Sequence, residues 1–468
     1  MDIHISSFEI ERHDISTRMP FKYGIATMTH LPHVFIRIEA SFDGETVKGI
    51  SADHLPPKWF TKEPNKDPLD EIGDMLAVIN QAATLSKEIR ASSVFSFWHK
   101  LYQAQDAWAA ENNIPPLLAH FGTSLIERSL IDAFTRFKDQ SFKQLLQSNA
   151  FGIDWAPLRP ELAGLTPKDL LEAQSLSSIT IRHTVGLADY LFENDIPAEE
   201  LLSDGLPQSL EAVIQFYGVT HFKIKINGET ESDIQRLISI AALFRSLDLE
   251  DFAFTLDGNE QFHEVSSFRK FWDTLQNDEE MRAFFKRLIF VEQPFHRDIA
   301  LTEPIGTDLR AWNDAPPIII DESDGSLDSL PKALELGYRG TSHKNCKGVF
   351  KGIINRATII SRNRQVGKER YIMSGEDLAN IGPIANHQDL VVQSALGIQS
   401  VERNGHHYFK GLSIFNQSIQ DNAAECFQKL YTKDKNGYVR LNIQKGVLEI
   451  EELTNRHFGT DAINLNLL

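Results

Sequence analysis

Lysines and apolar residues alternate in the stretch HFKIKIN at 221–227. A period of two is the period of a β-strand, so Lys223 and Lys225 lie on one face of the strand. Two ammonium groups side by side within a strand are costly unless anionic groups lie opposite them. The pair therefore predicts that carboxylates approach this strand in the folded chain.

Carboxylates end each of the next three strand-like stretches, and a further lysine ends the stretch after those. In chain order these residues are Asp257 (followed by Asn259 and Glu260), Glu292, Asp321 (followed by Glu322) and Lys344. From Lys223 onward the intervals are 34, 35, 29 and 23 residues, each about the length of one strand and one helix. The charged residues thus belong to neighbouring strands and not to one face of a helix.

Three carboxylates at adjacent strand ends form a cluster of hard oxygen ligands. Mg²⁺ prefers such ligands and keeps positions for water or substrate, whereas the soft ligands typical of zinc are missing from the set.

In an eight-stranded barrel the second and sixth strands lie opposite each other, so Lys225 and Lys344 face each other across the metal. A nearby cation and a second lysine disfavour the ammonium form, which lets one lysine act as a base. A metal on a substrate carboxylate stabilises the charge left when the α-proton leaves. The residues therefore predict proton abstraction next to a carboxylate.

Strands and helices alternate from about residue 178 onward. The strand-like stretches lie at 178–186, 220–227, 252–259, 288–294, 316–323, 340–348, 370–377 and 397–404. The middle stretches are continuous apolar runs, which is typical of parallel strands buried on both faces. Eight such units in roughly 230 residues predict a (β/α)8-type barrel, with the charged strand ends at its mouth. A doubly wound open sheet is the alternative, although no Gly-x-Gly-x-x-Gly loop favours it.

The first 150 residues predict an α+β domain. Two strands flank an Asp-Gly turn, and three amphipathic helices follow. The strands are expected at 33–42 and 46–51, and the helices at 69–90, 94–112 and 124–137. The segments 20–30 and 51–60 are predicted to be loops, the first of them mobile and the second with Trp59 exposed.

Domain limits are expected in the proline-containing segment 150–170 and after the eighth strand. This division gives an N-terminal domain at 1–150, a barrel domain at 151–404 and a C-terminal tail at 405–468. Two short strands within 438–453 end the strand–helix pattern, and the tail is expected to pack back on the N-terminal domain.

The net charge of the 468-residue chain is 47 − 65 = −18. Nucleic acids and anionic membranes need a basic surface, so neither is an expected partner. The chain has no apolar run of about 18 residues and no N-terminal leader pattern. Its two cysteines, Cys346 and Cys426, suggest no disulfide framework. These features favour a cytoplasmic location.

The ordered motifs resemble the enolase superfamily, in particular its muconate lactonizing enzyme-like subgroup within the mandelate racemase/muconate lactonizing enzyme family. The stretches FKIKI, LDGNEQ, VEQP, IIDES and HKNCKG carry the resemblance, and SLIERSLIDAF resembles the helix that leads into the barrel of that family. The resemblance covers nearly the whole chain. It implies a modified TIM barrel with an α+β capping domain that the C-terminal tail completes, and a homo-oligomer is compatible with it.

The resemblance also implies roles for individual residues. Mg²⁺ would be held by Asp257, Glu292 and Asp321, and Lys225 and Lys344 would transfer protons. Lys223 would hold or polarise the carboxylate of a small substrate. Residues expected to contact the substrate or to orient these groups are Asn259, Glu322, Tyr23, Trp59, His183 and Glu402.

Three departures from the family pattern bear on the reaction. Lys347-Gly348-Val349 follows the sixth strand in place of a Gly-Gly pair. Glu402-Arg403-Asn404 stands where dipeptide epimerases have Asp-x-Asp, and Lys344 stands in place of the His–Asp dyad of mandelate racemases. We therefore expect an isomerase that forms a metal-stabilised enediolate and leads to racemisation, epimerisation or cycloisomerisation. The alternatives are β-elimination, by a dehydratase or an o-succinylbenzoate synthase-like lyase, and a barrel that binds a metal or metabolite without turnover.

Overall fold

Eight parallel strands close into a ring in the computed structural model, which describes residues 1–23, 25–460 and 463. In chain order the strands are β4 (Ser178–Val185), β5 (His221–Lys225), β6 (Ala253–Asp257), β7 (Leu288–Glu292), β8 (Ile318–Ile320), β9 (Gly340–His343), β10 (Ile372–Gly375) and β11 (Ser400–Glu402). Each strand pairs with the next, and β11 pairs with β4, with Ser400 opposite Thr180. The predicted barrel is confirmed, and the open-sheet alternative is wrong because the first and last strands are hydrogen-bonded.

The register of the ladder brings the charged strand ends together. Lys225 lies opposite Asp257 on β6, and Asp257 lies opposite Glu292 on β7. Because all eight strands run in the same direction, their carboxyl ends meet at one mouth of the barrel.

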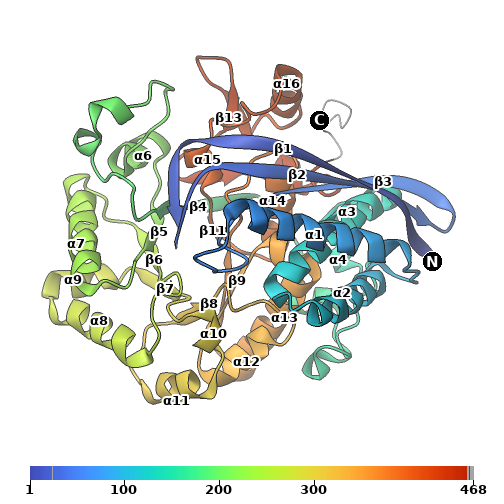
Figure 1. Cartoon of the computed structure of the whole chain (residues 1–468), viewed down its shortest axis with the longest axis horizontal. Helices are drawn as coiled ribbons and strands as arrows, with labels where there is room; N and C mark the ends of the chain where they lie inside the picture. The colour runs from blue at the N-terminus through green and yellow to red at the C-terminus, as the bar shows by residue number, and fades with distance from the viewer. Residues whose placement is uncertain (24, 461–462, 464–468) are drawn as a thin grey trace.

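Helices cover the outside of the barrel (Figure 1). They include α7 (Thr230–Ser246), α8 (Val265–Asn277), α9 (Glu279–Phe285), α11 (Glu303–Ala311), α12 (Ser329–Leu336), α13 (Val349–Val366) and α14 (Ala385–Ala395). Their apolar faces pack on the strands: Phe244 of α7 lies with its ring 4.5 Å from that of Phe222 on β5. Among the described helices, none combines the length and apolar character that crossing a membrane requires.

The N-terminal domain joins a three-stranded antiparallel sheet to a helical layer. The sheet consists of β1 (Ile3–Tyr23), β2 (Ala26–Phe42) and β3 (Glu45–His54), and the main helices are α1 (Pro68–Lys87), α2 (Val94–Glu111) and α3 (Pro116–Lys138). Figure 1 shows the β1–β2 hairpin running from the side of these helices across the barrel. The turn at Asp43-Gly44 and the three helices agree with the sequence prediction.

The predicted mobile loop at 20–30 is wrong, because most of this segment belongs to the two strands of the hairpin. Phe21 pairs with Met28 across the hairpin. The ring of Phe21 also stacks on that of Tyr408 at 4.1 Å. An isolated two-stranded ribbon is marginally stable, so contacts with a segment almost 400 positions away help to order this end. The local sequence does not reveal those contacts.

The tail contacts both larger parts of the chain. Its strand β14 (Val447–Glu449) pairs antiparallel with the beginning of β4. Further along, the carbonyl of His457 accepts a hydrogen bond from the backbone of Phe142 at 2.7 Å, and the ring of Phe458 packs on that of Phe142. The three-part division at residues 150 and 404 remains a prediction.

Glu127 of α3 links the N-terminal domain to the barrel. Its carboxyl oxygens accept hydrogen bonds from the backbone nitrogens of Val349 (3.0 Å) and Phe350 (2.6 Å), in the first turn of α13. Burial raises the pKa of this carboxyl to about 8, although the two backbone N–H groups and Arg128 act in the opposite direction. The folded chain therefore keeps a proton on Glu127 at pH values where the unfolded chain has lost it.

We expect a pH-dependent difference between the wild type and Glu127→Gln. Between the usual carboxyl pKa of 4.5 and about 8 the folded state binds more protons, so wild-type stability falls as the pH rises. Glutamine does not titrate. The unfolding free energy of the variant should thus increase relative to wild type by more than about 1.4 kcal/mol, the equivalent of one pKa unit, between pH 5 and pH 8.5. Urea unfolding at both pH values measures this, and a relative gain for the wild type would contradict it.

Candidate active site

A cavity of about 70 Å³ lies between the mouth of the barrel and the N-terminal domain. One water needs ~10–15 Å³ of such space, so the cavity has room for roughly five waters or a small organic molecule. Ten of the twelve residues singled out in the sequence line it: Tyr23, Trp59, Lys223, Lys225, Asp257, Asn259, Asp321, Glu322, Lys344 and Glu402. Residues from both domains are therefore needed to form it.

Trp59 is not exposed, and that part of the sequence prediction is wrong. Only 9 % of its surface is accessible. Its ring lies 5.1 Å from the Nζ of Lys344, within the range of a cation–π interaction. An apolar ring beside this cation limits the access of water to the lysine.

Lys223 occupies the centre of the charged floor of the cavity. Its Nζ lies 2.8–3.0 Å from four carboxylates, which belong to Asp257, Glu292, Glu376 and Glu402. Burial by itself would lower the pKa of this ammonium, but the four surrounding carboxylates outweigh burial and raise the pKa well above its usual value. Lys223 is thus held in its ammonium form among these four carboxylates.

The two other predicted lysines come from opposite sides of the ring. Lys225, at the end of β5, binds Asp257 at 2.9 Å and Asn259 at 3.0 Å. Lys344, directly after β9, binds both oxygens of Asp321 at 2.8 Å and Glu376 at 2.7 Å. Burial would lower the pKa of Lys344, but Asp321 and Glu376 raise it well above its usual value. These two contacts favour the ammonium form of Lys344.

Glu376 and Glu402 form a hydrogen-bonded pair of carboxyl groups at the ends of β10 and β11. Such a bond requires a proton on one partner. Burial raises the pKa of Glu402, and the charge of Glu376 adds to this effect. For Glu376, burial is outweighed by Lys223 and Lys344, which lower its pKa well below the usual value. These opposite directions favour a proton on Glu402 over one on Glu376.

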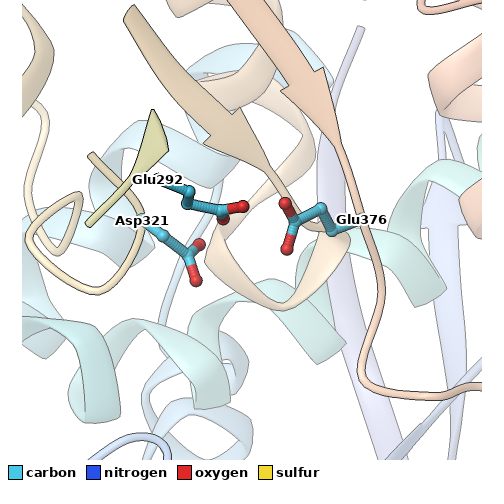
Figure 2. Close-up of side chains that lie close together, drawn as sticks. All are labelled: Glu292, Asp321 and Glu376. Atoms are coloured by element: carbon cyan, nitrogen blue, oxygen red, sulfur yellow. The ribbon is translucent and has the colours of Figure 1, made fainter. Parts of the chain in front are cut away.

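Glu292, Asp321 and Glu376 are close enough to hold one metal ion. One oxygen of each lies within 4.8 Å of the others, and all three side chains are buried. Figure 2 shows the carboxyl groups of Glu292 and Glu376 pointing toward each other, with Asp321 beside them. Neither oxygen of Glu292 accepts a well-formed hydrogen bond, although one lies 2.9 Å from the Nζ of Lys223. Burial and the charge of Glu376 raise the pKa of Glu292 well above its usual value. A group of hard, incompletely bonded oxygens of this kind fits Mg²⁺.

The ligand set predicted from the sequence differs from this cluster at one position. Glu292 and Asp321 belong to both sets. Asp257 lies at the end of the neighbouring strand β6, where its carboxylate binds Lys223 and Lys225. Burial would raise the pKa of Asp257, but these two lysines lower it.

The remaining predicted residues have different surroundings. Burial and the charge of Asp321 raise the pKa of Glu322 to about 8. Tyr23 donates its hydroxyl to the carbonyl of Pro57 at 2.7 Å. His183 is buried against His406, with 3.3 Å between ring nitrogens, and is not among the described residues that line the cavity. Glu292 also lies outside the lining, beneath its floor.

Glu376 and Lys347 contact predicted site residues but were not themselves among them. Glu376 lies at the end of the seventh strand-like stretch, so the same rule of charged strand ends could have identified it. Lys347 binds Asp321 at 2.7 Å. It lies where the family pattern has glycine, so this departure from the pattern was the available signal.

No protein-family model matches the sequence, and no curated protein resembles it in sequence. Solved structures do resemble its fold. A mandelate racemase/muconate lactonizing protein from Herpetosiphon aurantiacus has a TM-score of 0.60 and 15 % identity, with 97 % of both chains covered. An N-succinyl Arg/Lys racemase from Bacillus cereus has a TM-score of 0.57 and 15 % identity, also with 97 % of both chains covered. An enolase from Bradyrhizobium, solved with magnesium and mandelic acid, has a TM-score of 0.58 and 11 % identity over 98 % of this chain and 96 % of that one.

These likenesses define the class of fold. The chain has the barrel fold of the mandelate racemase/muconate lactonizing enzyme structures of the enolase superfamily. The fold implied by the sequence resemblance is thus confirmed. At such low identities the likeness does not extend to the reaction, which depends on the site itself.

Proposed function

We propose that this protein is a Mg²⁺-dependent enzyme that removes the α-proton of a small carboxylate. The observation that carries the proposal is the presence of Lys225 and Lys344 in the wall of one cavity, on strands four places apart in a ring of eight. Two lysines on opposite sides of a bound substrate are suited to removing and returning a proton on opposite faces of one carbon.

The charged floor supports this assignment. Lys223 lies at the centre of the floor in its ammonium form, and we assign to it a contact with the substrate carboxylate. Glu402, whose carboxyl lines the cavity beside Lys223, would contact an oxygen of the substrate. Trp59 and the hairpin end cover the cavity, and exclusion of water strengthens each of these electrostatic interactions.

Mg²⁺ would be held by Glu292 and Asp321, which the sequence pattern and the geometry have in common. The two criteria select different residues as the third ligand. The order of charged strand ends selects Asp257, whereas the distances between carboxylate oxygens select Glu376. When bound, the metal would supply Lewis-acid stabilisation of the negative charge that develops on the substrate carboxylate. Magnesium and mandelic acid in the Bradyrhizobium structure agree with a metal and a carboxylate in this fold.

The paired lysines favour racemisation, epimerisation or cycloisomerisation. In the first two reactions one lysine takes the α-proton and the other returns a proton to the opposite face. A β-elimination is the second candidate, since the amino group of Lys344 lines the cavity and in its ammonium form could protonate a leaving group. A barrel that binds a metal or metabolite without turnover would leave two facing lysines without a chemical role.

The test is exchange of the α-proton with solvent. The Mg²⁺-loaded protein is incubated in D₂O with a panel of carboxylic acids, and ¹H NMR follows the α-proton signal. Exchange with at least one acid is expected, and inversion of configuration or appearance of an alkene then identifies the reaction type. Binding of acids without any exchange or turnover would favour the non-catalytic barrel.

A further inference from the structure

The cavity has a charged face and an apolar face. Most charged groups of the lining come from the carboxyl ends of the barrel strands. The apolar part of the lining, which we call the apolar wall, comprises Phe21, Tyr23, Met28, Pro56, Leu378 and Ala379. The first three of these residues come from the end of the β1–β2 hairpin, which lies across the barrel (Figure 1).

The apolar wall is held in place by a separate hydrophobic cluster. Phe21, Met28 and Ala379 pack in it with Tyr408 and Phe409. Phe21 and Met28 are only 6 % and 5 % exposed. Because the hydroxyl of Tyr23 is already bonded to the carbonyl of Pro57, Tyr23 contributes its ring rather than a hydrogen-bond donor. The wall is thus a fixed apolar surface and not a set of mobile side chains.

The two lysines nearest the apolar wall are already neutralised within the protein. Lys58 binds Glu71 at 3.1 Å and the carbonyl of Glu63 at 2.7 Å. Lys62 lies 3.1 Å from Glu260. Neither is available as a partner for a second carboxylate or a phosphate of the substrate.

The acidic groups at the edge of the wall are also paired. Asp377 lies 2.8 Å from Arg403, and Glu260 binds Arg297 at 2.7 Å. A substrate ammonium here would compete with a guanidinium for each carboxylate. Glu322, with one oxygen lacking a hydrogen-bond partner, also lines the cavity and follows directly after Asp321, so we group it with the charged face.

We infer that the substrate is a small monocarboxylate whose substituent beyond the α-carbon is apolar, either alkyl or aryl, and lies against the apolar wall. This inference rests on the proposed function and specifies its substrate class. The carboxylate would bind the charged face, and the substituent would bury its surface on Phe21, Met28 and Leu378. A charged or polyhydroxylated substituent would lose its water there without gaining a partner, which is unfavourable.

The test compares acids that share one α-substituent and differ only at the distal group. α-Proton exchange in D₂O is measured with phenyl, isobutyl, carboxylate, ammonium and polyhydroxyl groups at that place. We expect kcat/KM for the phenyl or isobutyl acid to exceed that of the other three at least 100-fold. Preferred exchange of a charged or polyhydroxylated acid would overturn the inference and leave the proposed function intact. A lack of exchange with every acid would instead overturn the proposed function and this inference with it.

A matched pair of variants on one hairpin tests the wall directly. Met28→Lys places an ammonium group in the wall, so kcat/KM for the apolar acid should fall at least tenfold and that for the dicarboxylate should rise. Thr29→Lys makes the same change one residue further along the same strand, at an exposed residue that does not line the cavity, and should leave both values unchanged. Equal effects of the two substitutions would contradict the inference. The wild-type comparison stands even if Met28→Lys does not fold.

Discussion

Replacing Lys225 or Lys344 with alanine is expected to abolish racemisation or epimerisation while leaving part of the proton exchange. Each variant keeps one lysine and should still exchange the α-proton of the enantiomer whose hydrogen faces that lysine. A general acid or base typically contributes 10²–10⁴-fold in rate. We expect at least a 10³-fold loss of inversion in each variant, and complementary exchange of opposite enantiomers.

The physical reason is the position of the two side chains on the ring. Lys225 ends β5, and Lys344 follows β9, four strands away. A substrate bound between them presents one face of its α-carbon to each. ¹H NMR in D₂O with each pure enantiomer measures exchange, and polarimetry measures inversion.

Lys351→Met serves as the matched control. Lys351 is a buried lysine that pairs with Asp324 at 2.9 Å and is not among the described residues lining the cavity. Its loss should change stability and leave exchange intact. If Lys225→Ala and Lys344→Ala were to lose exchange of the same enantiomer, the two lysines would not flank the α-carbon, and the two-base assignment would be wrong.

Loss of metal binding is the second large expected effect. Glu292→Gln and Asp321→Asn should each weaken Mn²⁺ or Mg²⁺ binding more than tenfold, because each removes a charged oxygen ligand that both ligand sets contain. Treatment with a chelator should abolish α-proton exchange in the wild type, and added Mg²⁺ should restore it. Mn²⁺ titration followed by electron paramagnetic resonance measures affinity independently of activity.

The metal affinities of Asp257→Asn and Glu376→Gln show which of these two residues is the third metal ligand. The variant that loses affinity to the same extent as Glu292→Gln identifies the ligand, and the other should alter exchange more than metal affinity. Glu63→Gln is a surface control with unchanged metal affinity expected, because the Glu63 side chain does not line the cavity. Unchanged metal affinity in both Glu292→Gln and Asp321→Asn would refute a metal site at this cluster.

The sequence by itself determined the barrel and the order of charges around it. Parallel strands that alternate with helices are marked by apolar runs, and the carboxyl ends of such strands must meet at one mouth. Asp257, Glu292 and Asp321 could therefore be assigned to neighbouring strands from their spacing alone. Ten of the twelve residues singled out from the sequence pattern and the family resemblance together line one cavity.

Only the tertiary structure decided which charges meet. Lys223 has four carboxylates around it because strands from the whole circumference of a barrel converge at its centre. One of these carboxylates belongs to Glu376, 153 positions away from Lys223 in the chain. Pairwise distances of this kind depend on the tilt and closure of the ring, which a linear pattern does not contain.

The cover of the cavity was likewise decided by tertiary contacts. The segment 20–30 has the polar, glycine-containing sequence of a loop, yet residues 21–23 pair with residues 26–28 and Phe21 stacks on Tyr408. Trp59, which belongs to the N-terminal domain, is buried because it packs over Lys344 of the barrel. Strand spacing thus determines the chemistry at the floor of the barrel. The apolar wall above it depends on contacts between residues distant in the chain, and such contacts cannot be predicted from the local sequence.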